Sequence, residues 1–237
     1  MRLFLALLGS GLAGEAVAFS AQSKPATETG VFIIRSGGRR IGTEKFTIRR
    51  VESGFEATAE LQLDIPGGSR VSENCTLQLD GKFNPTLYER RQQAPKKGTL
   101  KAQFRTSETT LVSQGEAGSQ EQLFYLPDHD LVVLDTNFFH HYAFLLRRYD
   151  PSRPGPQNFN VFVPQEATPG MVSLALQGKE NLSLNEATLE VNHFQAATED
   201  VKIEIWATPE GEIQRISIPQ GNLDIVREGE GKGKRSD

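Results

Sequence analysis

The feature that most constrains this chain is a single segment, residues 131–150, with a helical pattern in a sequence that otherwise alternates as β-strands do. Three short polar residues at 135–137 (Asp-Thr-Asn) can accept hydrogen bonds from the free amides of a first helical turn, and Pro151 supplies a stop. We therefore predict a helix from about Asn137 to Arg148. The rest of the chain must supply the surface against which this helix packs.

The predicted helix has two unlike sides. At about 100° per residue, one wide arc is apolar, and the other carries histidine and arginine side chains with Phe144 among them. The apolar arc needs a cover, which only a sheet can provide in this sequence. The apolar arc consists of Phe138, Phe139, Tyr142, Ala143, Leu145, Leu146 and Tyr149, and the polar arc of His140, His141, Arg147 and Arg148.

Alternation with a period of two is clearest in Phe55–Ile65, where every second residue is apolar and the residues between them are polar. Turn signals such as Asp80-Gly81 separate such segments, so neighbouring strands should pair antiparallel. The expected strands are Val31–Arg35, Ile41–Val51, Phe55–Ile65, Val71–Leu79, Phe83–Arg91, Leu100–Phe104, Thr109–Ser113, Gln122–Leu126, Phe159–Val163, Val172–Leu176, Leu182–Phe194, Val201–Ala207, Glu212–Ile218 and Leu223–Arg227.

The fold class predicted from these patterns is all-β and mainly antiparallel, with a strongly curved sheet or half-barrel around one central helix. Residues 29–227 are expected to form this β domain, with parts 29–127 and 151–227 joined by the helix-containing segment 128–150. Two hairpins of similar plan, at 77–90 and 203–218, leave open whether these parts are two similar halves.

The beginning of the chain has the pattern of a secretory signal, residues 1–18, with Arg2, an apolar core and a small-residue cleavage site at 16–18. We expect a secreted protein, and the location we expect for it is a bacterial periplasm. Residues 19–28 are predicted to be a flexible lead-in and residues 228–237 a disordered tail. No later run of 18 apolar residues occurs, so the mature chain is not expected to be integral to a membrane.

Charge and cysteine content exclude some functions. The formal net charge is −4 and no basic stripe is present, so nucleic acid is not an expected partner. Cys75 is the only cysteine, which excludes an internal disulfide, and its place on the apolar face of a strand predicts an inert packed thiol. The mature chain has no GxSxG nucleophile motif. The sequence leaves enzymatic activity undecided but favours its absence, and no cofactor is predicted.

Two hairpins carry a resemblance to known proteins. The first has the form Asp-Gly-x-aromatic-x-Pro at 80–85, and the second ends in Gly-x-Ile-x-x-Ile at 211–216. With the signal and the long amphipathic strands, they resemble bacterial envelope proteins of the outer-membrane lipoprotein carrier kind and related periplasmic families. The resemblance covers roughly residues 31–227 and implies a half-barrel whose concave face is closed by a helix. It matches no catalytic residue.

The resemblance also implies a cavity, either filled permanently by the helix or able to exchange that contact for a lipid or other amphipathic molecule. We predict a non-enzymatic binding or carrier module. Arginine can bind an anionic headgroup with two parallel hydrogen bonds, although the polar arc could instead be solvated, with its arginines paired to Asp150 or Glu166. The candidate ligand contacts are Phe138, Tyr142, Leu145 and Tyr149 for the apolar part, and His140, Arg147 and Arg148 for the polar head.

Two other functions stay open. An envelope protein could bind a structural partner through an exposed strand edge such as Leu223–Arg227. A metal-dependent hydrolase could use His129, Asp130 and His140 as ligands. Adjacent side chains on a helix diverge by about 100°, so His140 and His141 are not expected to share one ion, and the nearby arginines oppose a cation.

Overall fold

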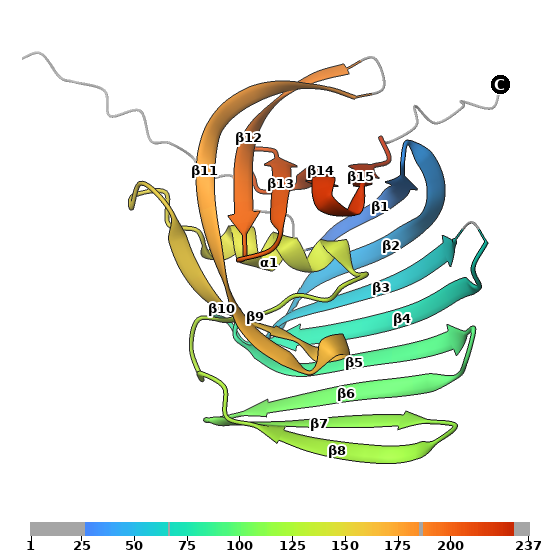
Figure 1. Cartoon of the computed structure of the whole chain (residues 1–237). Helices are drawn as coiled ribbons and strands as arrows, with labels where there is room; N and C mark the ends of the chain where they lie inside the picture. The colour runs from blue at the N-terminus through green and yellow to red at the C-terminus, as the bar shows by residue number, and fades with distance from the viewer. Residues whose placement is uncertain (1–26, 66, 185–186, 230–237) are drawn as a thin grey trace, which may run out of the picture.

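Strands from both parts of the chain join one sheet that curves around a short helix (Figure 1). The computed structural model describes residues 27–65, 67–184 and 187–229. The sheet has 15 strands in the order β8-β7-β6-β5-β4-β3-β2-β1-β15-β14-β13-β12-β11-β10-β9 and is not closed. The predicted fold class is therefore confirmed. The predicted signal, nearly all of the lead-in and most of the predicted tail lie outside the described residues.

The strands follow the alternating segments of the sequence. Their bounds are β1 Thr27–Ser36, β2 Arg39–Val51, β3 Gly54–Asp64, β4 Arg70–Leu79, β5 Pro85–Ala94, β6 Gly98–Arg105, β7 Glu108–Gly115, β8 Gly118–Phe124, β9 Leu131–Val133, β10 Gln157–Val163, β11 Thr168–Leu184, β12 Ala187–Ala197, β13 Lys202–Ala207, β14 Ile213–Ile218 and β15 Leu223–Arg227. The helical elements are the 3-10 turns η1 Phe139–His141, η2 Pro164–Glu166 and η3 Pro219–Gly221, and the α-helix α1 Tyr142–Arg148.

The two ends of the described chain meet in the middle of the sheet. Strands β1 to β8 form one antiparallel meander and β10 to β15 another, and β1 pairs antiparallel with β15, with Phe32 opposite Arg227. The short strand β9 pairs parallel with β10. The free edges of the described sheet are thus β8 and β9, both from the middle of the sequence. The predicted free edge at Leu223–Arg227 is wrong, because β15 is paired on both sides, with β14 and β1.

Three further local predictions are wrong. The expected strand Leu182–Phe194 is a hairpin in which Leu184 of β11 pairs with Ala187 of β12, and alternation on both sides hides the reversal. Residues 131–133, the first part of the segment with the helical pattern, form the strand β9. Residues 27 and 28, expected in the flexible lead-in, belong to β1, and Glu28 is buried.

The helix lies inside the curve of the sheet (Figure 1). All residues of η1 and the first five of α1 are buried. The predicted start at Asn137 is too early, because residues 139–141 form a 3-10 turn before α1 begins. The predicted solvated polar arc is also wrong, since His140 and His141 have no exposed surface.

The two ends of the sheet come close to each other. Phe162 of β10 contacts Phe124 of β8 and Phe104 of β6, with ring centroids 5.0 and 6.2 Å apart. The two ends of the sheet therefore meet through side chains and not through backbone hydrogen bonds.

We predict that removing a helix side chain from this enclosed core destabilises the fold strongly. Leu145 is fully buried, so Leu145→Ala should lower the free energy of unfolding by about 2–5 kcal/mol. Leu123→Ala in β8 is the matched control, because Leu123 is 49% exposed, and should change it by less than about 0.5 kcal/mol. Urea unfolding of both variants is the measurement, and equal effects would contradict the enclosed position of α1.

Candidate functional site

The first turn of the helical segment is held by a carboxylate from a distant strand. Glu44 of β2 is fully buried and accepts hydrogen bonds from the backbone amides of Phe139 at 2.8 Å and His140 at 3.3 Å. Its Oε1 also lies 2.5 Å from His140 Nδ1. The predicted cap, Asp135, instead accepts a hydrogen bond from the amide of Asn137 in a tight turn before the helix. Glu44 therefore supplies, across 95 positions of sequence, the acceptor that the local residues do not.

Burial keeps the groups around this turn uncharged. Desolvation raises the pKa of Glu44 to about 8, against the lowering effect of the two backbone hydrogen bonds. Desolvation also lowers the pKa of His140 to about 3 and that of His141 well below its ordinary value. Burial therefore favours the neutral form of both imidazoles. His140 also has no exposed surface, so the structure does not place it where a headgroup outside the core could reach it.

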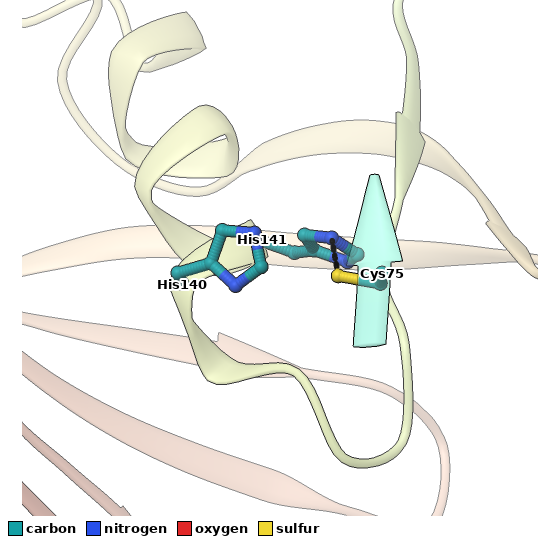
Figure 2. Close-up of side chains that lie close together, drawn as sticks. All are labelled: Cys75, His140 and His141. Atoms are coloured by element: carbon teal, nitrogen blue, oxygen red, sulfur yellow. Dashed lines mark hydrogen bonds between the residues drawn. The ribbon is translucent and has the colours of Figure 1, made fainter. Parts of the chain in front are cut away.

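Next to Glu44, three potential metal ligands face one another in the core (Figure 2). Cys75 projects from β4, and its Sγ lies 3.9 Å from His141 Nε2. One ligating atom each of Cys75, His140 and His141 lies within 4.8 Å of the other two. The imidazole centroids are 4.4 Å apart, hardly more than the roughly 3.8 Å between consecutive Cα atoms. The expectation that adjacent histidines diverge is wrong here, because the two rings contact each other edge to face.

The structure does not assemble the metal ligands proposed from the sequence. The side chains of His129 and Asp130 are 78% and 68% exposed, whereas His140 lies in the core. His129 pairs with Asp128 at 2.9 Å, and this hydrogen bond raises the pKa of His129. Among the described residues, one group of three or more ligating side chains is close enough to hold an ion, and it consists of Cys75, His140 and His141.

A second buried polar group lies beside this cluster. The hydroxyl of Tyr88 donates a hydrogen bond to Asp135 Oδ2, and both residues are buried. Desolvation raises the pKa of Asp135 to about 6, although Tyr88 and the amide of Asn137 act in the opposite direction. The folded state therefore binds the Asp135 proton more tightly than the unfolded state does.

We predict from this pKa that Asp135 makes the fold less stable as the pH rises. A carboxyl group with a raised folded-state pKa contributes its full stability below the unfolded pKa of 3.8 and loses it as the pH rises through about 6. Relative to Asp135→Asn, the wild type should lose up to about 3 kcal/mol of unfolding free energy between pH 4 and pH 7. Denaturant titrations of both proteins at several pH values measure this, and parallel pH profiles would contradict it.

A cavity opens at the other end of α1. It has a volume of about 530 Å³ and lies between the helix, the β2–β3 side of the sheet and the β12–β14 side. Tyr149 and Leu146 form its helix wall, and the turn at residues 208–211 contributes to its rim. The lining residues are Glu28, Ile48, Arg49, Arg50, Phe55, Phe83, Leu146, Arg147, Tyr149, Pro151, Leu176, Asn192, Phe194, Thr208, Pro209, Glu210, Gly211 and Glu212.

The cavity has aromatic walls and a charged rim. Phe55 and Phe83 stack with centroids 4.6 Å apart on one side, and Tyr149 meets Phe194 edge to face at 5.3 Å on the other. Around them, the arginines at 49 and 50 and the glutamates at 210 and 212 give the rim both signs of charge. An apolar interior with a few polar groups at its margin is the usual composition of a small-molecule site.

Of the ligand contacts predicted from the sequence, Tyr149 and Arg147 line this cavity. Phe138, Tyr142, Leu145 and His140 are buried away from it, in the core around the helix. Arg148 is directed elsewhere and bonds Asn84 Oδ1 at 2.9 Å, the Leu131 carbonyl at 3.2 Å and Asp130 at 3.3 Å.

Arg147 is anchored by an ion pair that joins three elements. Its guanidinium lies 2.7 Å from Glu28 of β1, which is also 3.1 Å from Arg227 of β15. The expected pairing of these arginines with Asp150 or Glu166 is therefore replaced by Glu28 for Arg147 and Asp130 for Arg148. Because Arg147 is already paired, its charge is largely compensated at the cavity wall.

Sequence reasoning missed the cavity walls Phe55, Phe83 and Phe194. Each belongs to a different strand or turn, and their meeting depends on the curvature of the sheet. In the sequence, Phe55 is only the first residue of a clear strand. Phe83 is only part of the 80–85 hairpin. Phe83 adopts a positive φ of 65° in that hairpin, a conformation that directs it away from a regular strand position.

Comparison with known proteins supports the architecture alone. No protein-family model matches the chain, and no curated protein matches its sequence. The fold is similar to the crystal structure of a β-barrel-like protein of domain of unknown function DUF1849 from Brucella abortus. The TM-score is 0.58 at 8% sequence identity, over 84% of this chain and 94% of the other. The two proteins thus share a half-barrel-like fold. No helix of the described residues has the length and apolar composition needed to cross a bilayer.

Proposed function

We propose that this protein is a non-enzymatic binding or carrier module of the bacterial periplasm for an apolar or amphipathic molecule. The observation that carries the proposal is the cavity of about 530 Å³ at the C-terminal end of α1. Its volume lies within the roughly 300–1,000 Å³ typical of small-molecule sites. The secretory pattern of residues 1–18 supports the location.

The ligand chemistry follows from the walls. An acyl chain or another apolar body would lie against Phe55, Phe83 and Phe194, where its burial replaces water on apolar surface. A polar head would stay at the rim, next to Arg50, which forms no ion pair within the described part of the chain. The helix itself remains in place, since its first turn is buried and bonded to Glu44.

The two alternative functions require other surfaces than the sequence indicated. A structural or interaction protein of the envelope would have to pair through β8, an edge strand that is exposed along nearly its whole length, because β15 lies inside the sheet. A metal-dependent hydrolase would need an ion beside the cavity, but His129 does not line it and His140 is enclosed in the core. Ligand binding in the cavity therefore explains more of the structure.

We predict that a bulky side chain inside the cavity weakens ligand binding strongly while the fold is kept. Asn192 lines the cavity, so Asn192→Trp should weaken binding of a fluorescent fatty acid at least about tenfold. Leu189→Trp is the matched control, because it places the same side chain on the same strand away from the lining. Fluorescence titration with delipidated protein measures both.

Native mass spectrometry of the protein purified from a periplasm provides an independent test, and co-purified lipid should be present in the wild type and absent from Asn192→Trp. The proposal fails if the wild type binds no fluorescent fatty acid and carries no lipid, or if both tryptophan variants bind like the wild type.

A further inference from the structure

We propose that Cys75, His140 and His141 form a buried structural binding site for a thiophilic transition-metal ion, with Zn²⁺ as the ion that suits them best. The site is separate from the proposed ligand cavity, which neither histidine lines. One thiolate and two imidazoles are ligands that Zn²⁺ accepts in tetrahedral sites. A water molecule can take the fourth position.

The spacing of the three groups fits an ion after a small contraction. Zn–S bonds of about 2.3 Å and Zn–N bonds of about 2.0–2.1 Å place tetrahedral S and N ligands about 3.5 Å apart. Cys75 Sγ and His141 Nε2 are 3.9 Å apart, and a nitrogen of His140 completes a set within 4.8 Å. An approach of a few tenths of an ångström between Cys75 Sγ and His141 Nε2 therefore suffices for this pair.

An unpartnered nitrogen points to the same conclusion. His140 Nε2 is fully buried and has no hydrogen-bond partner among the described residues, an arrangement that costs free energy unless something binds to it. The opposite nitrogen, Nδ1, is held by Glu44 at 2.5 Å. A carboxylate on Nδ1 orients the ring and leaves the lone pair of Nε2 for a metal, which is the usual arrangement around zinc-bound histidines.

Acidic side chains surround the cluster. Glu44, Asp135 and Glu73 are all buried near Cys75, and Arg90 lies 3.8 Å from Glu73. The two arginines that seemed to oppose an ion belong to the last turn of α1, where Glu28 and Asp130 pair with them. Burial raises the pKa of all three carboxyl groups, and a divalent ion at the cluster would favour their ionised form.

Binding requires one proton to leave the thiol. The Cys75 S–H bond breaks, the sulfur lone pair forms the bond to Zn²⁺, and the proton passes to solvent. No oxidant or reductant takes part. Because the three side chains are enclosed once the sheet has closed over them, the ion would enter during folding, so its binding free energy adds to the stability of the fold.

Refolding with a single metal tests the proposal. The protein is unfolded with chelator and refolded with Co²⁺ alone, which replaces Zn²⁺ and absorbs light. We expect about one Co²⁺ per chain, a thiolate-to-cobalt charge-transfer band in the near ultraviolet and ligand-field bands in the visible region. With Zn²⁺ alone, a concentration 100 times the dissociation constant should shift the folding equilibrium about 100-fold.

Two variants assign the signal. Cys75→Ala should lose the charge-transfer band and the Zn²⁺-dependent stabilisation, whereas His129→Ala should keep both, since His129 is exposed and outside the cluster. If Cys75→Ala does not refold, His141→Gln, which should lower the Co²⁺ content and shift the visible bands, replaces it. The proposal is overturned if the refolded wild type shows no charge-transfer band and no stabilisation by Zn²⁺, or if Cys75→Ala retains the band.

Discussion

The hydrogen bonds from the amides of Phe139 and His140 to the Glu44 carboxylate are the interaction on which the rest of this structure depends. A helix of seven residues is too short to be stable by itself, and the N-cap residues of η1 and α1 supply no side-chain acceptor. Glu44 provides one from the middle of β2, inside the concave face of the sheet. The burial of a carboxyl group opposes folding, and its three hydrogen-bonding contacts offset that cost. The position of α1 follows from this contact.

Once α1 is fixed, its two ends acquire different chemistry. The N-terminal end lies deep in the core, where Cys75 and the two histidines meet. At the C-terminal end, Glu28 connects Arg147 to Arg227 and so ties the helix to the first and last strands of the sheet. The sheet does not close fully over that end, which leaves the cavity beside Tyr149. One short helix thus separates a site suited to an ion from a site suited to an apolar molecule.

Local patterns in the sequence predicted most of the strands, the fold class and the presence of a single α-helix, because alternation and turn residues act over a few positions. Most of their failures lie where distant segments meet. The histidines looked solvated because the groups that cover them, Glu44 and Phe46 of β2 and Tyr88 of β5, are distant from them in the sequence. The supposed edge at residues 223–227 is internal because β1 pairs with it. The walls Phe55 and Phe194 meet around one cavity only through curvature, which no short pattern encodes.

Native-state hydrogen exchange at the amides of Phe139 and His140 tests the central claim most directly. If Glu44 holds the first turn inside the curved sheet, both amides should exchange as slowly as those of β2 and β3, through unfolding of the whole domain. Glu44→Ala removes the acceptor. In this variant the free energy of exchange of both amides should fall by at least as much as the free energy of unfolding of the domain. Rapid exchange in the wild type, at the rate of an exposed turn, would contradict the account.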